Sequence, residues 1–149
     1  MAMNSREQQL KAFERLLDIM DELRAKCPWD REQTFESLRN LTIEETYELA
    51  DAIIEYDNSG IEKELGDLLL HIVFYAKIGS EKGAFDIADV ANSISEKLIF
   101  RHPHVFADIK VRNSNDVKEN WEELKMKEKD NHSVLGGVPK SLPAMIKAN

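Results

Sequence analysis

The chain has 149 residues, of which 42% are hydrophobic and 32% are charged, and its formal net charge is −8. This length and composition fit one globular domain with its own core, and no apolar run is long enough for a membrane span or a signal peptide. A negative charge without a long Lys/Arg cluster argues against binding of duplex nucleic acid, which depends on cation–phosphate contacts.

The first predicted helix covers residues 5–25 and begins with a capping box formed by Ser5 and Gln8. Its apolar residues recur at helical spacing and are Leu10, Phe13, Leu16, Leu17, Met20 and Leu23. The helix is expected to end at Cys27, because Pro28 disfavours helical backbone at the residue before it. Cys27 is the single cysteine, which excludes an internal disulfide and fits a reducing cytosol, so we expect a cytoplasmic protein.

Four further helices are predicted, at about residues 42–57, 61–82, 86–100 and 115–130. Residues 28–33 are expected to form a connector, after which Thr34 starts a short helical turn. The stretch 58–60, Asn-Ser-Gly, is expected to separate the second helix from the third. Asp86 suits the N-cap of the fourth helix, whose apolar stripe consists of Ile87, Val90, Ala91, Ile94 and Leu98.

The remaining segments are expected to be irregular. Residues 101–106 read as a loop centred on Pro103, and residues 107–113 are ambiguous between states. The tail from His132 contains two glycines and two prolines. The prediction is therefore an all-α bundle of about five helices over residues 1–131, followed by an irregular tail over 132–149.

Four acidic residues form the most informative pattern in the chain. Glu45 and Glu48 are three residues apart on the second helix, and Glu64 and Asp67 are three apart on the third. Positions i and i+3 lie on one face of a helix, so two adjacent antiparallel helices would bring four carboxylates around one small volume. Such a cluster must take up protons or bind cations. Oxygen donors without cysteine suit Mg²⁺, with Mn²⁺ as the alternative.

Two structural interpretations compete with the metal site on the second helix. Its acidic side chains form a solvated face, and Thr42 with Glu45 also fits a capping box. The third helix favours the metal site because apolar residues surround nearly its whole circumference, which is typical of a buried element. Glu64 and Asp67 would then lie at the edge of an interior, where unpaired carboxylates are costly.

The histidines carry weaker signals. His102 and His104 flank Pro103, but two histidines without cysteine or carboxylate at fixed spacing are a poor zinc pattern. His71 follows Asp67 by one helical turn, which brings it close enough to contact a metal-bound water. We expect it to be an interior histidine with a backbone partner.

The two acidic motifs, Glu-Glu-x-x-Glu and then Glu-x-x-Asp, resemble the signature of the MazG nucleotide pyrophosphohydrolases. Other segments are similar to the same family in the same order, namely residues 27–34, 64–69, 101–106 and 121–125. The resemblance covers roughly residues 8–145. It implies hydrolysis of a nucleoside triphosphate between its α and β phosphates, which gives the monophosphate and pyrophosphate.

The resemblance also implies roles for individual residues. The Mg²⁺ ligands would be Glu45, Glu48, Glu64 and Asp67, with Glu44 helping to orient the attacking water. The phosphates would contact Lys97 and Arg101, and the nucleotide would lie near Trp121 and Lys125. Lys97 and Arg101 are one turn apart, and arginine suits bidentate phosphate contact. The alternatives are ion-paired cations for these two residues, a core position for Trp121, and pairing of Lys125 with Glu122 or Glu128.

Two departures from the family pattern bear on activity. Gly60 stands four positions before Glu64, where active relatives can carry a lysine, and Lys63 is expected to point about 100° away from Glu64. Residues 139–143 resemble the stretch that leads into the second half of two-domain MazG proteins. The alternative function is therefore a catalytically weak dimerisation or regulatory module that supports a second, active MazG domain. The apolar helices predict a homodimer or higher homo-oligomer in both cases.

Overall fold

The computed structural model describes residues 2–108 and 110–129, and within them every regular element is a helix. The chain divides into two compact units, Met1–Val90 and Ala91–Asn149. The all-α prediction is confirmed, but the expected number of about five helices is too low. The described residues form seven, because two short helices occupy segments that the sequence analysis assigned to connectors.

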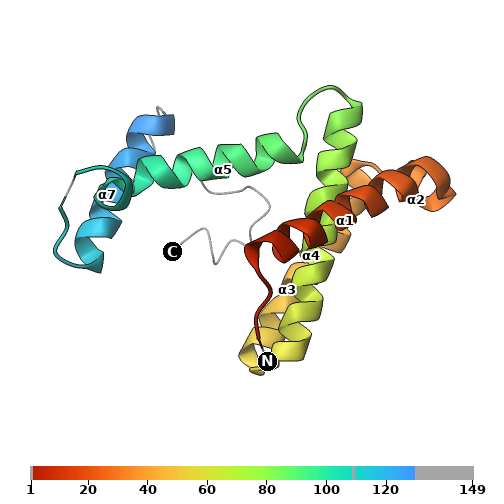
Figure 1. Cartoon of the computed structure of the whole chain (residues 1–149), viewed down its shortest axis with the longest axis horizontal. Coiled ribbons are helices and arrows are strands. Elements are labelled where there is room, and N and C mark those ends of the chain that lie inside the picture. The colour runs from red at the N-terminus through yellow and green to blue at the C-terminus, as the bar shows by residue number, and fades with distance from the viewer. Residues whose placement is uncertain (1, 109, 130–149) are drawn as a thin grey trace. The chain divides into compact units, whose positions relative to one another are not determined.

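The first unit is built around one antiparallel pair of long helices. These are α3 (Phe35–Ile54) and α4 (Asn58–Glu81), which lie side by side along their length (Figure 1). The helix α1 (Arg6–Lys26) packs across α4, and the short α2 (Pro28–Glu32) packs on α1. The core of this unit consists of Met20, Leu38, Val73, Phe74 and Ile78.

The first helix begins as predicted. The Ser5 hydroxyl accepts a hydrogen bond from the Gln8 backbone N–H at 3.1 Å, and the Gln8 side chain accepts one from the Ser5 N–H at 2.8 Å. The helix ends at Cys27, whose extended backbone follows from the proline after it. The predicted connector 28–33 is wrong in part, because Pro28 occupies the first turn of α2, where its missing N–H has no intrahelical acceptor.

The helix α3 begins seven residues earlier than predicted. Thr34 is its N-cap and forms a capping box with Ser37, through bonds of 3.1 and 2.8 Å. The sequence analysis expected only a short helical turn after Thr34 and a separate helix from about residue 42, whereas the structure has one continuous helix from Phe35. The serine hydroxyl makes the bond that glutamate or glutamine makes in the usual capping box. Thr42 and Glu45 therefore lie in the middle of the helix, so the interpretation of them as a capping box is wrong.

The turn between α3 and α4 lies three residues earlier than expected, at 55–57 rather than 58–60. The Asp57 backbone N–H donates to the Ala52 carbonyl at 3.1 Å and ends α3, while the Asp57 side chain accepts the Gly60 N–H at 3.0 Å and begins α4. Tyr56 lies between them in the left-handed region, with φ of 56°. The predicted break at 58–60 is therefore wrong, since these residues form the first turn of α4.

Three helices follow α4 in the described residues. The helix α5 (Ile87–Arg101) is capped by Asp86, whose carboxylate accepts the Asp89 N–H at 3.0 Å, as the sequence predicts. In the second unit, α6 (Pro103–Phe106) replaces most of the expected loop at 101–106, and α7 (Ser114–Lys129) agrees with the predicted fifth helix. The predicted tail 132–149 lies outside the described residues. Among the described helices, none has the length and apolarity needed to cross a lipid bilayer.

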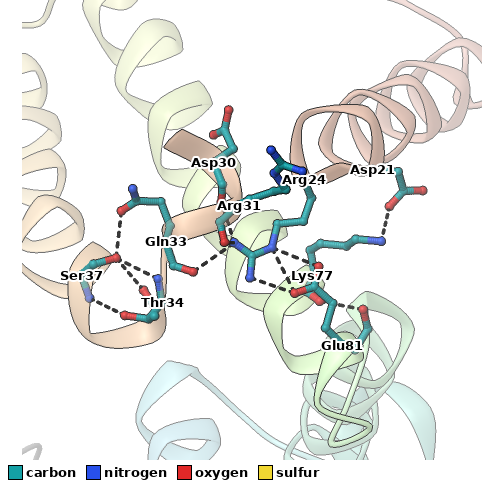
Figure 2. Close-up of polar contacts among 10 residues, drawn as sticks. Asp21, Arg24, Asp30, Arg31, Gln33, Thr34, Ser37, Lys77 and Glu81 are labelled. Atoms are coloured by element: carbon teal, nitrogen blue, oxygen red, sulfur yellow. Dashed lines mark hydrogen bonds and ion pairs between the residues drawn. The ribbon is translucent and has the colours of Figure 1, made fainter. Parts of the chain in front are cut away.

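Arg24 joins the elements of the first unit through a set of polar contacts at the end of α1. Its Nη1 donates to the carbonyls of Asp30, Arg31 and Gln33, the last two at 3.0 Å (Figure 2). Its Nε and Nη2 donate to the Glu81 carboxylate at 2.8–3.0 Å. Because the Arg24 side chain is only 12% exposed, these bonds are shielded from water and fix the α2 segment against α4.

We expect Arg24→Lys to destabilise the protein by about 2–3 kcal/mol, because lysine keeps the charge but cannot satisfy three carbonyls and a carboxylate at once. Urea unfolding followed by circular dichroism measures this change. Lys11→Ala is the matched control, since its ion pair with Glu7 is exposed and should contribute less than about 0.5 kcal/mol. Equal stability losses in the two variants would contradict the role given to Arg24.

Candidate metal centre

Four carboxylates converge where α3 faces α4. Glu45 and Glu48 project from α3, and Glu64 and Asp67 project from α4. One oxygen atom from each of the four lies within 4.8 Å of the others. The structure therefore brings together the two i, i+3 pairs that the sequence singled out, because α3 and α4 are neighbouring antiparallel helices.

The cluster is set into the surface of the α3–α4 pair. Glu64 is buried with 8% exposure, Glu45 and Asp67 are half-buried, and Glu48 is exposed. The Oε2 atoms of Glu45 and Glu64 are buried and have no hydrogen-bond partner among the described residues. Two buried carboxylate oxygens without a donor are costly, which makes the cluster a site that favours a cation or a proton.

The proton has a defined place in the metal-free cluster. Burial, followed by the neighbouring carboxylates of Glu64, Asp67 and Glu48, raises the pKa of Glu45 to about 7. Burial would also raise the pKa of Glu64, but hydrogen bonding from Lys63 and from the protonated Glu45 outweighs burial and lowers it. The opposite directions of the two pKa shifts favour protonation of Glu45 before Glu64 in the metal-free cluster.

Lys63 supplies the only positive charge found in contact with the cluster in the described part of the chain. Its Nζ lies 3.2 Å from Glu64 Oε1 and 3.9 Å from Asp67 Oδ2. The hydrogen bond to Glu64 raises the pKa of Lys63. The prediction that Lys63 points away is therefore wrong, because its long, flexible side chain reaches back over the surface to the acidic face. Its 71% exposure leaves it free to move aside.

The donor set fits a hard divalent cation. All four groups are carboxylates, and no cysteine or histidine joins them in the only metal-ligating group formed by the described residues. Oxygen-only donors at this spacing suit Mg²⁺ or Mn²⁺, which retain waters and accept phosphate oxygens. The two orphaned buried oxygens, on Glu45 and Glu64, point to the same conclusion.

The four residues expected to contact the phosphates and the nucleotide belong to the second unit, whereas Glu44 lies on α3 beside Glu45 and is exposed. Lys97, Arg101 and Trp121 line one cavity of about 360 Å³ between α5 and α7. Arg101 is buried, and its Nε donates to Glu128 Oε2 at 2.8 Å while its Nη2 has no partner among the described residues. The Trp121 ring lies 5.4 Å from the Arg101 guanidinium carbon and 5.7 Å from Lys125 Nζ. Lys125 therefore contacts the Trp121 ring.

The histidine expectations are resolved by their contacts. His71 is buried, but its partner is the Thr42 hydroxyl at 2.7 Å from Nδ1, so the expected backbone partner is wrong. His102 Nδ1 lies 2.7 Å from the Leu98 carbonyl, and its ring centroid is 5.5 Å from that of His104. No carboxylate joins this pair in the described residues.

Sequence reasoning missed two features beside the cluster. One is Lys63, which the i, i+4 relation to Asp67 would have indicated. The other is the contact of Thr42 with both His71 and Tyr75, which connects α3 to α4. Thr42 precedes Glu45 by three residues and His71 follows Asp67 by four, so helical spacing alone would have placed both near the acidic face.

Comparison with known proteins shows similarity over the part of the chain that contains the cluster. A family model described as the MazG nucleotide pyrophosphohydrolase domain matches residues 33–106, which include all four carboxylates. The chain is 48% identical over 145 residues to a nucleoside triphosphate pyrophosphohydrolase of Escherichia coli, with coverage of 93% of this chain and 55% of that protein. It is 45% identical over 140 residues to the nucleoside triphosphate pyrophosphohydrolase/pyrophosphatase MazG of Thermotoga maritima, with coverage of 91% and 53%.

A solved structure supports the fold. The crystal structure of a MazG-related protein from Thermotoga maritima superposes with a TM-score of 0.64 at 28% sequence identity. The match covers 75% of this chain and 97% of that one. The chain spans about half the length of the two curated relatives named above.

Glu45 gives a pH-dependent stability that can be tested without metal. Its raised pKa means that the folded state holds a proton which the unfolded chain releases near pH 4.5, so this stabilisation is present at low pH and is lost as pH rises to about 7. In EDTA, we expect Glu45→Gln to gain melting temperature relative to the wild type between pH 5 and pH 8. Comparing these two proteins cancels the opposite contribution of His71, whose pKa burial lowers.

Mg²⁺ should replace the proton of Glu45 above neutrality, so it should stabilise the wild type more at pH 8 than at pH 5. Thermal melts with and without Mg²⁺ at both pH values measure this difference. A melting-temperature gap between Glu45→Gln and the wild type that does not widen with pH would contradict the shared-proton arrangement.

Proposed function

The chain belongs to the MazG nucleotide pyrophosphohydrolase family, and from this we propose that it hydrolyses nucleoside triphosphates to the monophosphate and pyrophosphate with Mg²⁺. The observation that supports this most is the convergence of Glu45, Glu48, Glu64 and Asp67 within 4.8 Å, in the segment that matches the family. Two of these carboxylates have buried oxygens without a partner in the described residues, as a cation site requires.

In this proposal the four carboxylates hold Mg²⁺, with Mn²⁺ as a substitute. The metal, when bound, supplies charge neutralisation for phosphate oxygens and a lowered pKa for a water molecule. Lys63 moves from Glu64 and Asp67 toward solvent or phosphate as their charge is taken up by the cation, since its side chain is exposed and its contacts are surface ion pairs.

Glu44 is proposed to orient the attacking water. It precedes the ligand Glu45 on α3 and is exposed, so its carboxylate is free to accept a proton from water. The water oxygen attacks the α-phosphorus, the bond from that phosphorus to the α–β bridging oxygen breaks, and pyrophosphate leaves with the bridging oxygen. The proton lost by the water passes to the carboxylate.

Lys97 and Arg101 are proposed to bind phosphate, and Trp121 and Lys125 to lie near the nucleotide. The family resemblance assigns these roles, and the cavity shared by Lys97, Arg101 and Trp121 is compatible with them. The unpaired Nη2 of buried Arg101 is a further reason, because a guanidinium donor without a partner in the described residues has bonding capacity for an anion. The competing module function assigns these residues no part in turnover.

The test is pyrophosphate release from a panel of ribo- and deoxynucleoside triphosphates, with and without Mg²⁺. We expect Mg²⁺-dependent formation of equimolar monophosphate and pyrophosphate, and a loss of at least about 100-fold in Glu48→Gln and Asp67→Asn with helicity unchanged. Asp51→Asn is the matched control, because it removes a charge from the same α3 helix without belonging to the cluster. Normal turnover in both cluster variants would exclude the proposed site.

The second candidate, a catalytically weak module that supports another MazG domain, rests on Gly60, which stands where active relatives can carry a lysine. The same assay separates the two. Absence of release by folded protein that still binds Mg²⁺ would favour the module over the enzyme.

We also propose that the chain forms a homodimer. Leu65, Leu69 and Ile72 follow helical spacing on α4, yet all three are exposed in the single chain, so the expectation of an all-round buried helix is not met within it. A second copy of the chain would cover this stripe.

Sedimentation should therefore give twice the mass of the chain. The variant Leu69→Lys/Ile72→Lys should sediment as a monomer, whereas Leu10→Lys, which changes an exposed apolar residue on α1, should not. A wild-type monomer at micromolar concentration would contradict the proposal.

A further inference from the structure

A polar network crosses the interface between α3 and α4 beside the carboxylate cluster. The Thr42 hydroxyl oxygen on α3 lies 2.7 Å from His71 Nδ1 and 2.5 Å from the Tyr75 hydroxyl, both on α4. The same oxygen lies 3.1 Å from the Leu38 carbonyl of its own helix. His71 is 8% exposed, and the neighbouring Leu38, Val73 and Phe74 are core residues. The network is therefore a polar contact inside a mainly apolar interface.

The Thr42 hydroxyl is shared among three polar atoms. Its oxygen is within hydrogen-bond distance of the Leu38 carbonyl, which can only accept, and of His71 Nδ1 and the Tyr75 hydroxyl, each of which can donate or accept. Thr42 is therefore the polar partner of both α4 side chains, whichever ring nitrogen of a neutral His71 carries the proton.

The network and the cluster occupy successive turns of the same two helices. Thr42 lies three residues before Glu45 on α3, and His71 lies four residues after Asp67 on α4. Each helix contributes two of the four carboxylates, so the distance between the two pairs depends on how α3 sits against α4. Sliding one helix along the other would separate Thr42 from His71 and leave the buried Nδ1 of His71 without its hydrogen-bond partner.

We propose that Thr42, His71 and Tyr75 are positioning residues that fix α3 against α4 and thereby hold the carboxylates at a spacing selective for Mg²⁺ over Ca²⁺. This inference rests on the proposed function, because it takes the cluster to be the metal site. Mg²⁺ requires oxygen ligands at about 2.0–2.1 Å in near-octahedral geometry, whereas Ca²⁺ accepts about 2.3–2.6 Å and irregular geometry. A cluster whose two halves are free to slide would lose Mg²⁺ affinity first.

The experiment is calorimetric titration of metal-free protein with Mg²⁺ and, separately, with Ca²⁺, without nucleotide. Thr42→Val keeps the side-chain shape and removes the hydroxyl. We expect it to weaken Mg²⁺ binding about tenfold, in the range seen when groups that orient metal ligands are removed. Ca²⁺ binding should change much less, so the ratio of the two dissociation constants shifts. Thr42→Ser restores the hydroxyl and should recover the wild-type ratio.

Thr46→Val is the matched control. It makes the same change on the same helix, but the Thr46 hydroxyl is exposed and donates only to the Thr42 carbonyl at 2.9 Å, within α3. Its Mg²⁺/Ca²⁺ ratio should equal that of the wild type. Tyr75→Phe removes one donor of the network without altering the core volume, and it provides the test if Thr42→Val does not fold.

The outcomes separate the inference from the proposed function. Two results would overturn the positioning role while the metal site stands. In both, the wild type binds Mg²⁺, and Thr42→Val either weakens Mg²⁺ and Ca²⁺ binding equally or leaves the binding of both ions unchanged. If the wild type does not bind Mg²⁺, the proposed function and this inference fail together. A selective loss of Mg²⁺ binding in Thr42→Val with rescue in Thr42→Ser supports the inference.

Discussion

The packing of α3 against α4 is the constraint on which the rest of the site depends. Asp57 fixes one end of this packing. Its backbone N–H donates to the Ala52 carbonyl at the end of α3, and its side chain accepts the Gly60 N–H at the start of α4. A turn of three residues leaves no slack, so the second helix must return alongside the first. Glu45 and Glu48 then face Glu64 and Asp67 across the interface, although some fifteen residues of chain separate the pairs.

The cluster is electrostatically unfavourable as an isolated group, and the molecule reduces that cost in three ways. A proton on Glu45 removes one charge, since burial and its acidic neighbours raise its pKa to about 7. Lys63 offsets charge on Glu64 and Asp67 from the surface. Exposure of Glu48 leaves the fourth carboxylate hydrated. Each of these is weak or reversible, so a divalent cation can replace them all.

The convergence of the four carboxylates could be predicted from the sequence because helical spacing is local: two residues three apart share a face wherever the helix begins. The helix boundaries were less predictable. The cap of α3 pairs Thr34 with Ser37 rather than with the glutamate or glutamine of the usual capping box. Asn58 and Gly60 are typical turn residues, but here the Asp57 side chain caps a helix that begins with them. Burial was also misjudged on α4. Apolar residues surround that helix, but periodicity cannot tell which apolar face the same chain covers, and Leu65 is left exposed.

Gly60 and Lys63 are connected through the same turn. A Cβ atom at position 60 would lie 2.4 Å from Asp57 Oδ2, so any side chain there would push against the carboxylate that caps α4. A lysine at position 60 would therefore require Asp57 to give up or rearrange the cap that closes the α3–α4 turn. Lys63, one turn further along, places an ammonium group 3.2 Å from Glu64 without disturbing that turn. With glycine at position 60, the chain keeps the tight α3–α4 turn that brings the carboxylates together. With lysine at position 63, it also keeps an ammonium group beside the cluster.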